Sequence, residues 1–138
     1  MIQQLNPTQL IFHTLSHKLD DDLPQIRAKA AESLGKIGDR TAVETLINHL
    51  LNETDLETRQ TIIQSLEKIG TEKVFSYLIQ SLTDQNPKVR AVAAIALGEI
   101  GTEATLSELS QACSDPDDDV RLSAVDALGK IGYRYALN

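Results

Sequence analysis

Hydrophobic and polar residues alternate along this chain with the period of an α-helix. In the stretch PKVRAVAAIALGEIG, which begins at Pro87, the apolar residues Val89, Ala93, Leu97 and Ile100 follow one another at intervals of three or four positions. This spacing places them on one face of a helix. The pattern therefore predicts an amphipathic helix that ends near residue 101.

The same hydrophobic pattern returns four times, and each copy ends in nearly the same five letters. LGKIG occurs twice, and LEKIG and LGEIG stand between the two copies. Composition bias does not produce registered columns, so the chain contains a true internal repeat. Four columns keep a register of 31 or 32 residues: glycine (Gly38, Gly70, Gly101, Gly132), arginine (Arg27, Arg59, Arg90, Arg121), leucine (Leu34, Leu66, Leu97, Leu128) and isoleucine (Ile37, Ile69, Ile100, Ile131).

Each repeat is predicted to be a helical hairpin. Pro24 and Pro87 suit the first turn of a helix, and the closing glycine suits a left-handed C-cap. The helix that ends at each closing glycine is the first helix of a hairpin, and a second helix follows, starting near residues 41, 72 and 103. The chain opens with a second helix and closes with a first helix. We therefore expect about eight helices in a single domain, residues 1–138. Its predicted repeats are 9–19 (half), 22–52, 54–83, 85–114 and 116–132 (half).

The repeated motif, D-x5-R followed by small residues and ALGxIG, resembles the HEAT-like repeats named after phycobilisome lyases. The resemblance covers about residues 9–132, although Glu67 replaces the helix glycine and Thr58 replaces the aliphatic residue before the arginine. It implies an all-α fold, a right-handed α-solenoid of HEAT-like hairpins whose second helices build a concave face. Such repeats occur in chromophore lyases, phycobilisome-associated factors, regulatory ATPases and adaptors, so the resemblance implies function less sharply than fold.

Charge and composition exclude several classes of function. The formal net charge of −7 and the isoelectric point near 4.8 argue against nucleic-acid binding, which needs clustered lysine and arginine. No apolar run approaches the roughly 20 residues of a membrane helix, and the N-terminus lacks the pattern of a secretory signal. Cys113 is the single cysteine, so an internal disulfide is impossible. We expect a soluble, cytoplasmic protein.

Most of the chemically active side chains have a structural interpretation. An acid precedes each arginine by six residues, and the resemblance implies that these residues form a ladder between repeats rather than an anion site. His13 and His17 have the i, i+4 spacing of a zinc-binding pair, but no cysteine or HExxH motif accompanies them. Cys113 falls in the leucine column of the second helices and is predicted to be buried. The predicted structural ladder is Asp21, Arg27, Glu53, Arg59, Asp84, Arg90, Asp115 and Arg121.

One surface of the second helices changes from repeat to repeat while the core columns stay fixed. If Phe12, Val43, Phe75 and Leu106 face the core, the opposite face carries polar side chains and one aromatic residue. Stacked repeats make such a face continuous, and a tyrosine among amides and hydroxyls is typical of protein recognition. We call this surface the polar stripe: His13, Thr14, His17, Glu44, Thr45, Asn48, Ser76, Tyr77, Gln80, Ser107, Glu108 and Gln111.

These patterns favour a non-catalytic scaffold or adaptor that binds another protein through the concave face. No catalytic residue, cofactor site or metal site is predicted, so we expect that the chain is not an enzyme. The alternatives are a subunit or accessory factor of a bilin lyase, another phycobilisome-associated factor, and the repeat portion of a larger regulatory protein. The sequence does not name the partner.

The last predicted helix, residues 118–130, lacks a covering second helix. We expect Ala124, Leu128 and Ile131 to expose apolar surface, with Tyr133, Tyr135 and Leu137 folding back over only part of it. Terminal repeats normally need a polar outer face. The pattern therefore predicts end-to-end self-association, or continuation into further sequence.

Overall fold

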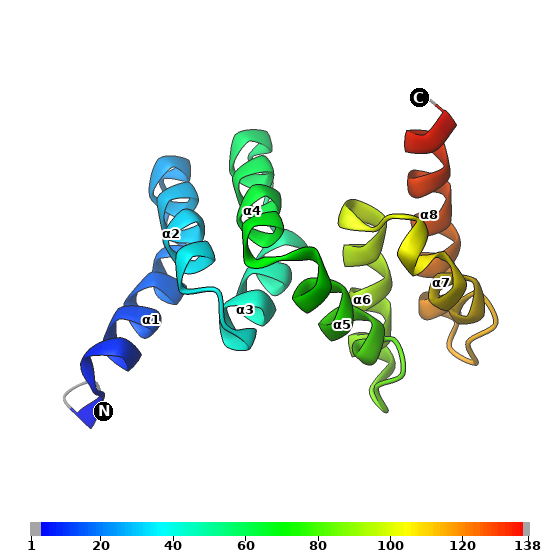
Figure 1. Ribbon diagram of the computed structural model, residues 1–138, viewed down its shortest axis with the longest axis horizontal. Helices are drawn as coiled ribbons and strands as arrows, with labels where there is room; N and C mark the ends of the chain where they lie inside the picture. The colour runs from blue at the N-terminus through cyan, green and yellow to red at the C-terminus, as the bar shows by residue number, and fades with distance from the viewer. Residues whose placement is uncertain (1–3, 137–138) are drawn as a thin grey trace. The chain divides into compact units, whose positions relative to one another are not determined.

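A computed structural model describes residues 4–136 of the chain, apart from the side chain of Thr71, and these residues are almost entirely helical (Figure 1). Within the described part there are eight α-helices and no β-strand, and a 3₁₀ turn precedes the seventh helix. The predicted all-α fold of helical hairpins is therefore confirmed. The helices are α1 (Pro7–Lys18), α2 (Pro24–Ile37), α3 (Arg40–Leu50), α4 (Leu56–Ile69), α5 (Thr71–Ser81), α6 (Pro87–Ile100), α7 (Leu106–Ala112) and α8 (Asp118–Ala136), with the 3₁₀ turn η2 (Glu103–Thr105) before α7.

The chain forms two compact units. Unit 1 is Met1–Thr71 and holds α1 to α4, and unit 2 is Glu72–Asn138 and holds α5 to α8. The single domain over residues 1–138 and its repeat boundaries stay a prediction.

Local sequence signals fix where the helices begin. Asn6 starts α1 with a capping box, in which its side chain accepts the Gln9 amide while the Gln9 side chain accepts the Asn6 amide. Asp39 and Asp55 accept backbone amides in the first turns of α3 and α4, at 2.8 and 2.9 Å. These side chains satisfy amides that have no partner within their own helix.

The core of unit 1 lies where α2 packs against α4 and α3. Leu34 and Leu46 are completely buried, as the leucine columns predicted. Gly35 allows α2 and α4 to approach closely, because a Cβ at this position would lie 2.8 Å from Cβ of Ser65. Small residues thus set the distance between neighbouring first helices.

Unit 2 repeats this arrangement with α6 and α8. Leu97 and Ile131 are completely buried. A Cβ at Gly98 would lie 2.9 Å from Cα of Ala127, so α8 approaches α6 as closely as α4 approaches α2. The repeated glycine therefore has a packing role in both units.

The closing glycines behave differently from one another. Gly38 adopts the predicted left-handed conformation at φ 66°, and Gly70 has a positive φ of 118° outside that region. The prediction of a left-handed cap is wrong at Gly101, whose backbone is extended, and at Gly132, which lies inside α8. Arg134 accounts for the longer helix, since its guanidinium donates to the carbonyls of Gly98 and Gly101 at 2.8 and 2.9 Å and anchors the last turns of α8 to the end of α6.

Three predicted core positions of the second helices are also wrong. Phe12, Leu106 and Cys113 are only half-buried, whereas Thr105 and Leu109 are completely buried. The 3₁₀ turn before α7 explains why Leu106 and Cys113 are not in the core, because its tighter winding rotates the side chains that follow it.

The apolar surface of the last helix differs from the prediction. Ala124 and Ile131 are buried, because they belong to the face of α8 that packs into unit 2, and Leu128 is half-buried. Tyr133 and Tyr135 continue the helix instead of folding back. Leu137 lies outside the described residues.

No helix formed by the described residues combines the length and the hydrophobicity that crossing a bilayer requires.

Candidate functional site

The arginine column closes the loop in front of each first helix. Arg27 Nη1 donates to the carbonyls of Asp21 and Asp22 at 2.8 and 3.2 Å. Its Nε and Nη2 atoms also hold both carboxylate oxygens of Glu53 at 2.9 Å, which ties α2 to the loop before α4. This bidentate geometry is the strong form of an arginine–carboxylate pair.

Unit 2 contains the same arrangement. Arg90 donates to the carbonyls of Asp84 and Gln85 and holds Asp115 through Nε and Nη2 at 2.9 and 3.0 Å. The hydrogen bond from Arg90 lowers the pKa of Asp115 below its ordinary value. The carboxylate is therefore held in its charged form by the neighbouring repeat.

The other two arginines also donate to their own loops. Arg59 reaches the carbonyls of Leu50 and Glu53 at 2.6 and 3.1 Å. Arg121 reaches the carbonyls of Asp115 and Pro116 at 2.8 and 3.2 Å and also contacts the Asp118 carboxylate. The four arginines thus lie in the first helices, and each donates to carbonyls of the loop in front of its own helix.

Glu53 is the most strongly perturbed acid of this group. Burial by itself raises its pKa, but hydrogen bonds from Arg27, from the Asp55 amide and from His49 outweigh this effect and lower the pKa to about 2. The His49 ring nitrogen lies 2.8 Å from Glu53, and its other nitrogen lies 3.5 Å from Asp20. Sequence reasoning missed His49, although its i, i+4 spacing from Glu53 was the available signal.

The polar stripe remains accessible in both units. None of its twelve residues is buried, whereas Val43, Leu46 and Leu78 on the same helices are buried. In unit 1 the stripe comes from α1 and α3, and in unit 2 it comes from α5 and α7. That these residues bind a partner stays a prediction.

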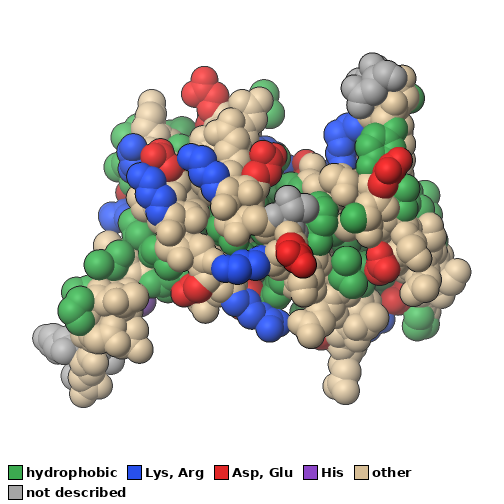
Figure 2. All heavy atoms as spheres, in the orientation of Figure 1, with side chains coloured by type: hydrophobic (Ala, Val, Ile, Leu, Met, Phe, Trp, Pro, Cys, Tyr) green, Lys and Arg blue, Asp and Glu red, His purple; other side chains and the backbone are tan. Residues whose placement is uncertain are grey.

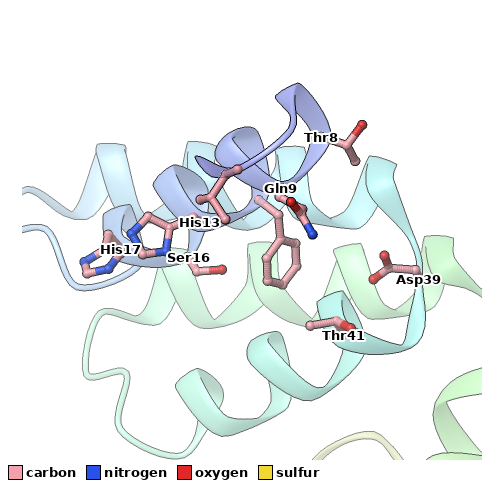
Figure 3. Close-up of a pocket in the computed structure, with 9 residues that line it drawn as sticks. Thr8, Gln9, His13, Ser16, His17, Asp39 and Thr41 are labelled. Carbon is pink, nitrogen blue, oxygen red and sulfur yellow. The ribbon is translucent and has the colours of Figure 1, made fainter. Parts of the chain in front are cut away.

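A pocket of about 490 Å³ opens beside the stripe in unit 1 (Figure 3). Its walls are one side of α1, which carries His13, Ser16 and His17, and the start of α3, where Asp39 and Thr41 lie at the other end of the pocket. The two imidazole rings are 4.5 Å apart between centroids and tilted by 56°. The remaining lining residues are Leu5, Thr8, Gln9 and Phe12.

Ser16 gives this pocket an unused hydrogen-bonding group. Its Oγ atom is buried and has no hydrogen-bond partner among the described residues. Leaving a buried polar atom unpaired costs about 1–3 kcal/mol, so a ligand or partner group that pairs with it gains affinity. The sequence carried no signal for Ser16, because its isolation depends on how α1 and α3 are placed.

Unit 2 has a second pocket, of about 480 Å³, which contains two residues of the polar stripe. Glu108 and Gln111 line it together with the Arg90–Asp115 pair. The same arginine therefore stabilises the loops and forms part of an accessible surface. No group of three or more metal-ligating side chains gathers anywhere in the part of the chain that the structure describes.

The family model of HEAT repeats matches residues 13–85 and 75–138. The chain belongs to the HEAT-repeat family. These matches cover both units, and they agree with the helical hairpins described above. The resemblance to the HEAT-like repeats of phycobilisome lyases is confirmed with them.

One curated relative is the bilin biosynthesis protein PecE of Mastigocladus laminosus. It is 38% identical over 63 residues, which are 46% of this HEAT-repeat chain and 23% of the relative. The expectation that the chain is not an enzyme is wrong on this finding, because the relative is a protein of bilin biosynthesis.

Among solved structures, the crystal structure of an engineered protein matches 87% of this chain and 62% of its own length. The sequence identity is 22% and the TM-score is 0.40.

Proposed function

We propose that this HEAT-repeat chain binds a protein partner through the polar stripe. The observation that carries the proposal is the contrast between fixed, buried core columns and a variable, accessible stripe on the same helices. Repeat proteins use such surfaces for recognition, because side chains there can change without disturbing the core.

The chemistry of the stripe supports a protein partner over a nucleic acid. Its charged residues are Glu44 and Glu108, both acidic, and its central aromatic residue is Tyr77. Tyrosine offers a large apolar ring and a polar tip, which is the combination enriched at interface anchors. A phosphate backbone would instead require a basic surface.

A direct binding measurement tests this proposal. Partners captured from a native extract by the wild-type chain would be identified, purified and titrated against Tyr77→Ala by calorimetry. We expect binding to weaken by roughly 1–3 kcal/mol. Gln64→Ala is the matched control, because Gln64 is exposed on α4 away from the stripe. Unchanged affinity in every stripe variant would overturn the proposal.

A role in bilin biosynthesis is the second candidate, and the match to PecE favours it. Because the matched segment spans only 23% of that protein, its whole activity is a proposal for this chain. The pocket in unit 1 offers an apolar wall, two imidazoles and the unpaired Ser16 hydroxyl to a ligand.

Absorption spectroscopy separates the two candidates. A linear tetrapyrrole would be mixed with the chain, alone and with the captured partner, and a shifted absorption band that Ser16→Ala and His13→Ala weaken would support the second candidate. An unchanged spectrum in both mixtures would count against it and leave partner binding standing.

A further inference from the structure

One face of α8 is exposed along about three turns, from Leu122 to Tyr133. Leu122, Val125 and Tyr133 are 70%, 58% and 68% exposed, and hydrophobic side chains are visible over this helix at the right of Figure 2. Gly129 and Gly132 lie on the same face, since 122, 125, 129, 132 and 133 follow the helical spacing of three, four and seven residues. A Cβ at either glycine would meet no atom within 4 Å.

The corresponding faces of α2 and α6 are covered by the next first helix. At the Val125 position they carry alanines, Ala31 and Ala94, which are completely buried. At the Gly129 position they carry Gly35 and Gly98, where an added Cβ would collide with α4 or α8. In α8 the glycine is kept but the alanine is replaced by a larger residue.

The face of α8 is complementary to itself. Leu122 and Val125 stand towards its N-terminal end, and Gly129 and Gly132, with Tyr133 beside them, stand towards its C-terminal end. Both pairs, Leu122 with Gly132 and Val125 with Gly129, are centred on residue 127. In an antiparallel pair of α8 helices, Leu122 therefore faces Gly132 of the other copy, and Val125 faces its Gly129. Each large side chain fills the space that a glycine leaves, as in ridge-and-groove packing of helices.

The charges along one edge of this face fit the same arrangement. Asp126 and Lys130 are neighbours on α8, 3.5 Å apart, with side chains 65% and 45% exposed. In an antiparallel pair with its centre near residue 127, Lys130 of each copy comes beside Asp126 of the other.

We propose that α8 is a self-association surface and that its occupant is α8 of a second copy of this chain. The two copies form an isologous dimer about a two-fold axis near residue 127. A single helix pair buries less area than a standard interface, so the dimer is weak and forms in the micromolar to millimolar range of chain concentration. This inference is independent of partner binding through the polar stripe.

Sedimentation equilibrium over that concentration range tests the proposal. Gly129→Leu fills the space that Val125 of the other copy needs, and Leu122→Lys removes the opposite contact, so each should weaken dimerisation at least about tenfold. Gly129→Leu also replaces a helix-interior glycine that has open space around it, so it leaves the fold intact. The control is Leu56→Lys, at a residue 75% exposed on α4. A monomer at every concentration, or a dimer unaffected by both α8 variants, would overturn the proposal.

Cysteine cross-linking tests the antiparallel orientation. In a Cys113→Ser background, chains carrying Val125→Cys and chains carrying Gly129→Cys would be mixed and oxidised. The proposal predicts that the mixed disulfide forms at least about tenfold faster than either homodimeric one, because only the mixed pair brings the two Cα atoms within disulfide range. Faster cross-linking of Val125→Cys with itself would indicate parallel helices and sink the proposed geometry.

Discussion

Glu53 shows how one residue links the repeats of unit 1. Its carboxylate accepts hydrogen bonds from Nε and Nη2 of Arg27 and from the backbone amide of Asp55, and it contacts the ring of His49. Most surface ion pairs contribute little to stability, but this carboxylate is almost inaccessible and bound on several sides. The negative charge of Glu53 therefore contributes to the stability of unit 1.

The free energy of unfolding should depend on pH through Glu53. Its pKa falls from an ordinary 4.5 to about 2 in the folded chain, so the folded state holds the proton less tightly than the unfolded state. The resulting stability is fully present above about pH 4.5 and is lost as the pH falls towards 2. Urea unfolding at several pH values should show a smaller loss over this window for Glu53→Gln than for the wild type. Glu57→Gln, at an exposed position, is the control; an equal loss in both variants would contradict the role of Glu53.

Leu97 tests the predicted core columns directly. The side chain is completely buried between helices, so Leu97→Ala should destabilise the chain by about 2–5 kcal/mol in chemical unfolding. Lys88→Ala, at an exposed site of the same helix, should change stability by less than about 0.5 kcal/mol. Glu99, on the same helix, would be a poor control, because it is half-buried and pairs with Lys130 at 3.3 Å. Similar losses for Leu97→Ala and Lys88→Ala would refute the helix register.

At the scale of the helices, the sequence predicted the periodic features and missed those that depend on a neighbour. The leucine column located the core, because burial of one helix face leaves a period in the sequence, and Leu34, Leu66 and Leu97 are buried. The prediction that the isoleucine column also packs inward is wrong at Ile37, Ile69 and Ile100, which are only half-buried. The repeated closing glycine looked identical in four places, yet Gly101 is extended and Gly132 is helical. Gly132 lies in the part of α8 that Arg134 anchors to the end of α6, a contact that no local pattern reveals.

A pair of glycine substitutions separates close packing from open space. Gly98→Ala puts a methyl group against the backbone of Ala127 and should destabilise by about 1–3 kcal/mol. Gly129→Ala meets nothing within 4 Å and removes a flexible residue from a helix interior, so it should stabilise by about 0.5–1 kcal/mol. Thermal unfolding at low chain concentration measures both. The two substitutions should change stability in opposite directions. A loss of stability at both positions would show that the local helix context, and not the packing around the glycine, determines the effect.

At the scale of the whole molecule, the candidate site was only partly readable from the sequence. The polar stripe could be predicted, because a second helix with a buried face has an opposite face at known positions. The pockets beside it could not be predicted, since they depend on the separation of helices such as α1 and α3. The hydroxyl of Ser16 illustrates this limit, because its missing partner is a property of the packed unit.

The acidic residues of the stripe should act on the rate of partner binding more than on its strength. Glu44 is partly exposed and already lies 3.5 Å from Arg40, so solvent and salt screen its interaction with an approaching protein. Charges in such positions steer encounter without adding much contact energy. In stopped-flow experiments, Glu44→Gln and Glu108→Gln should therefore change the association rate and reduce its dependence on salt, while the dissociation rate stays within about twofold. A large rise in the dissociation rate would show instead that these carboxylates are buried against the partner, and the centre of the interface would then have to move from Tyr77 towards them.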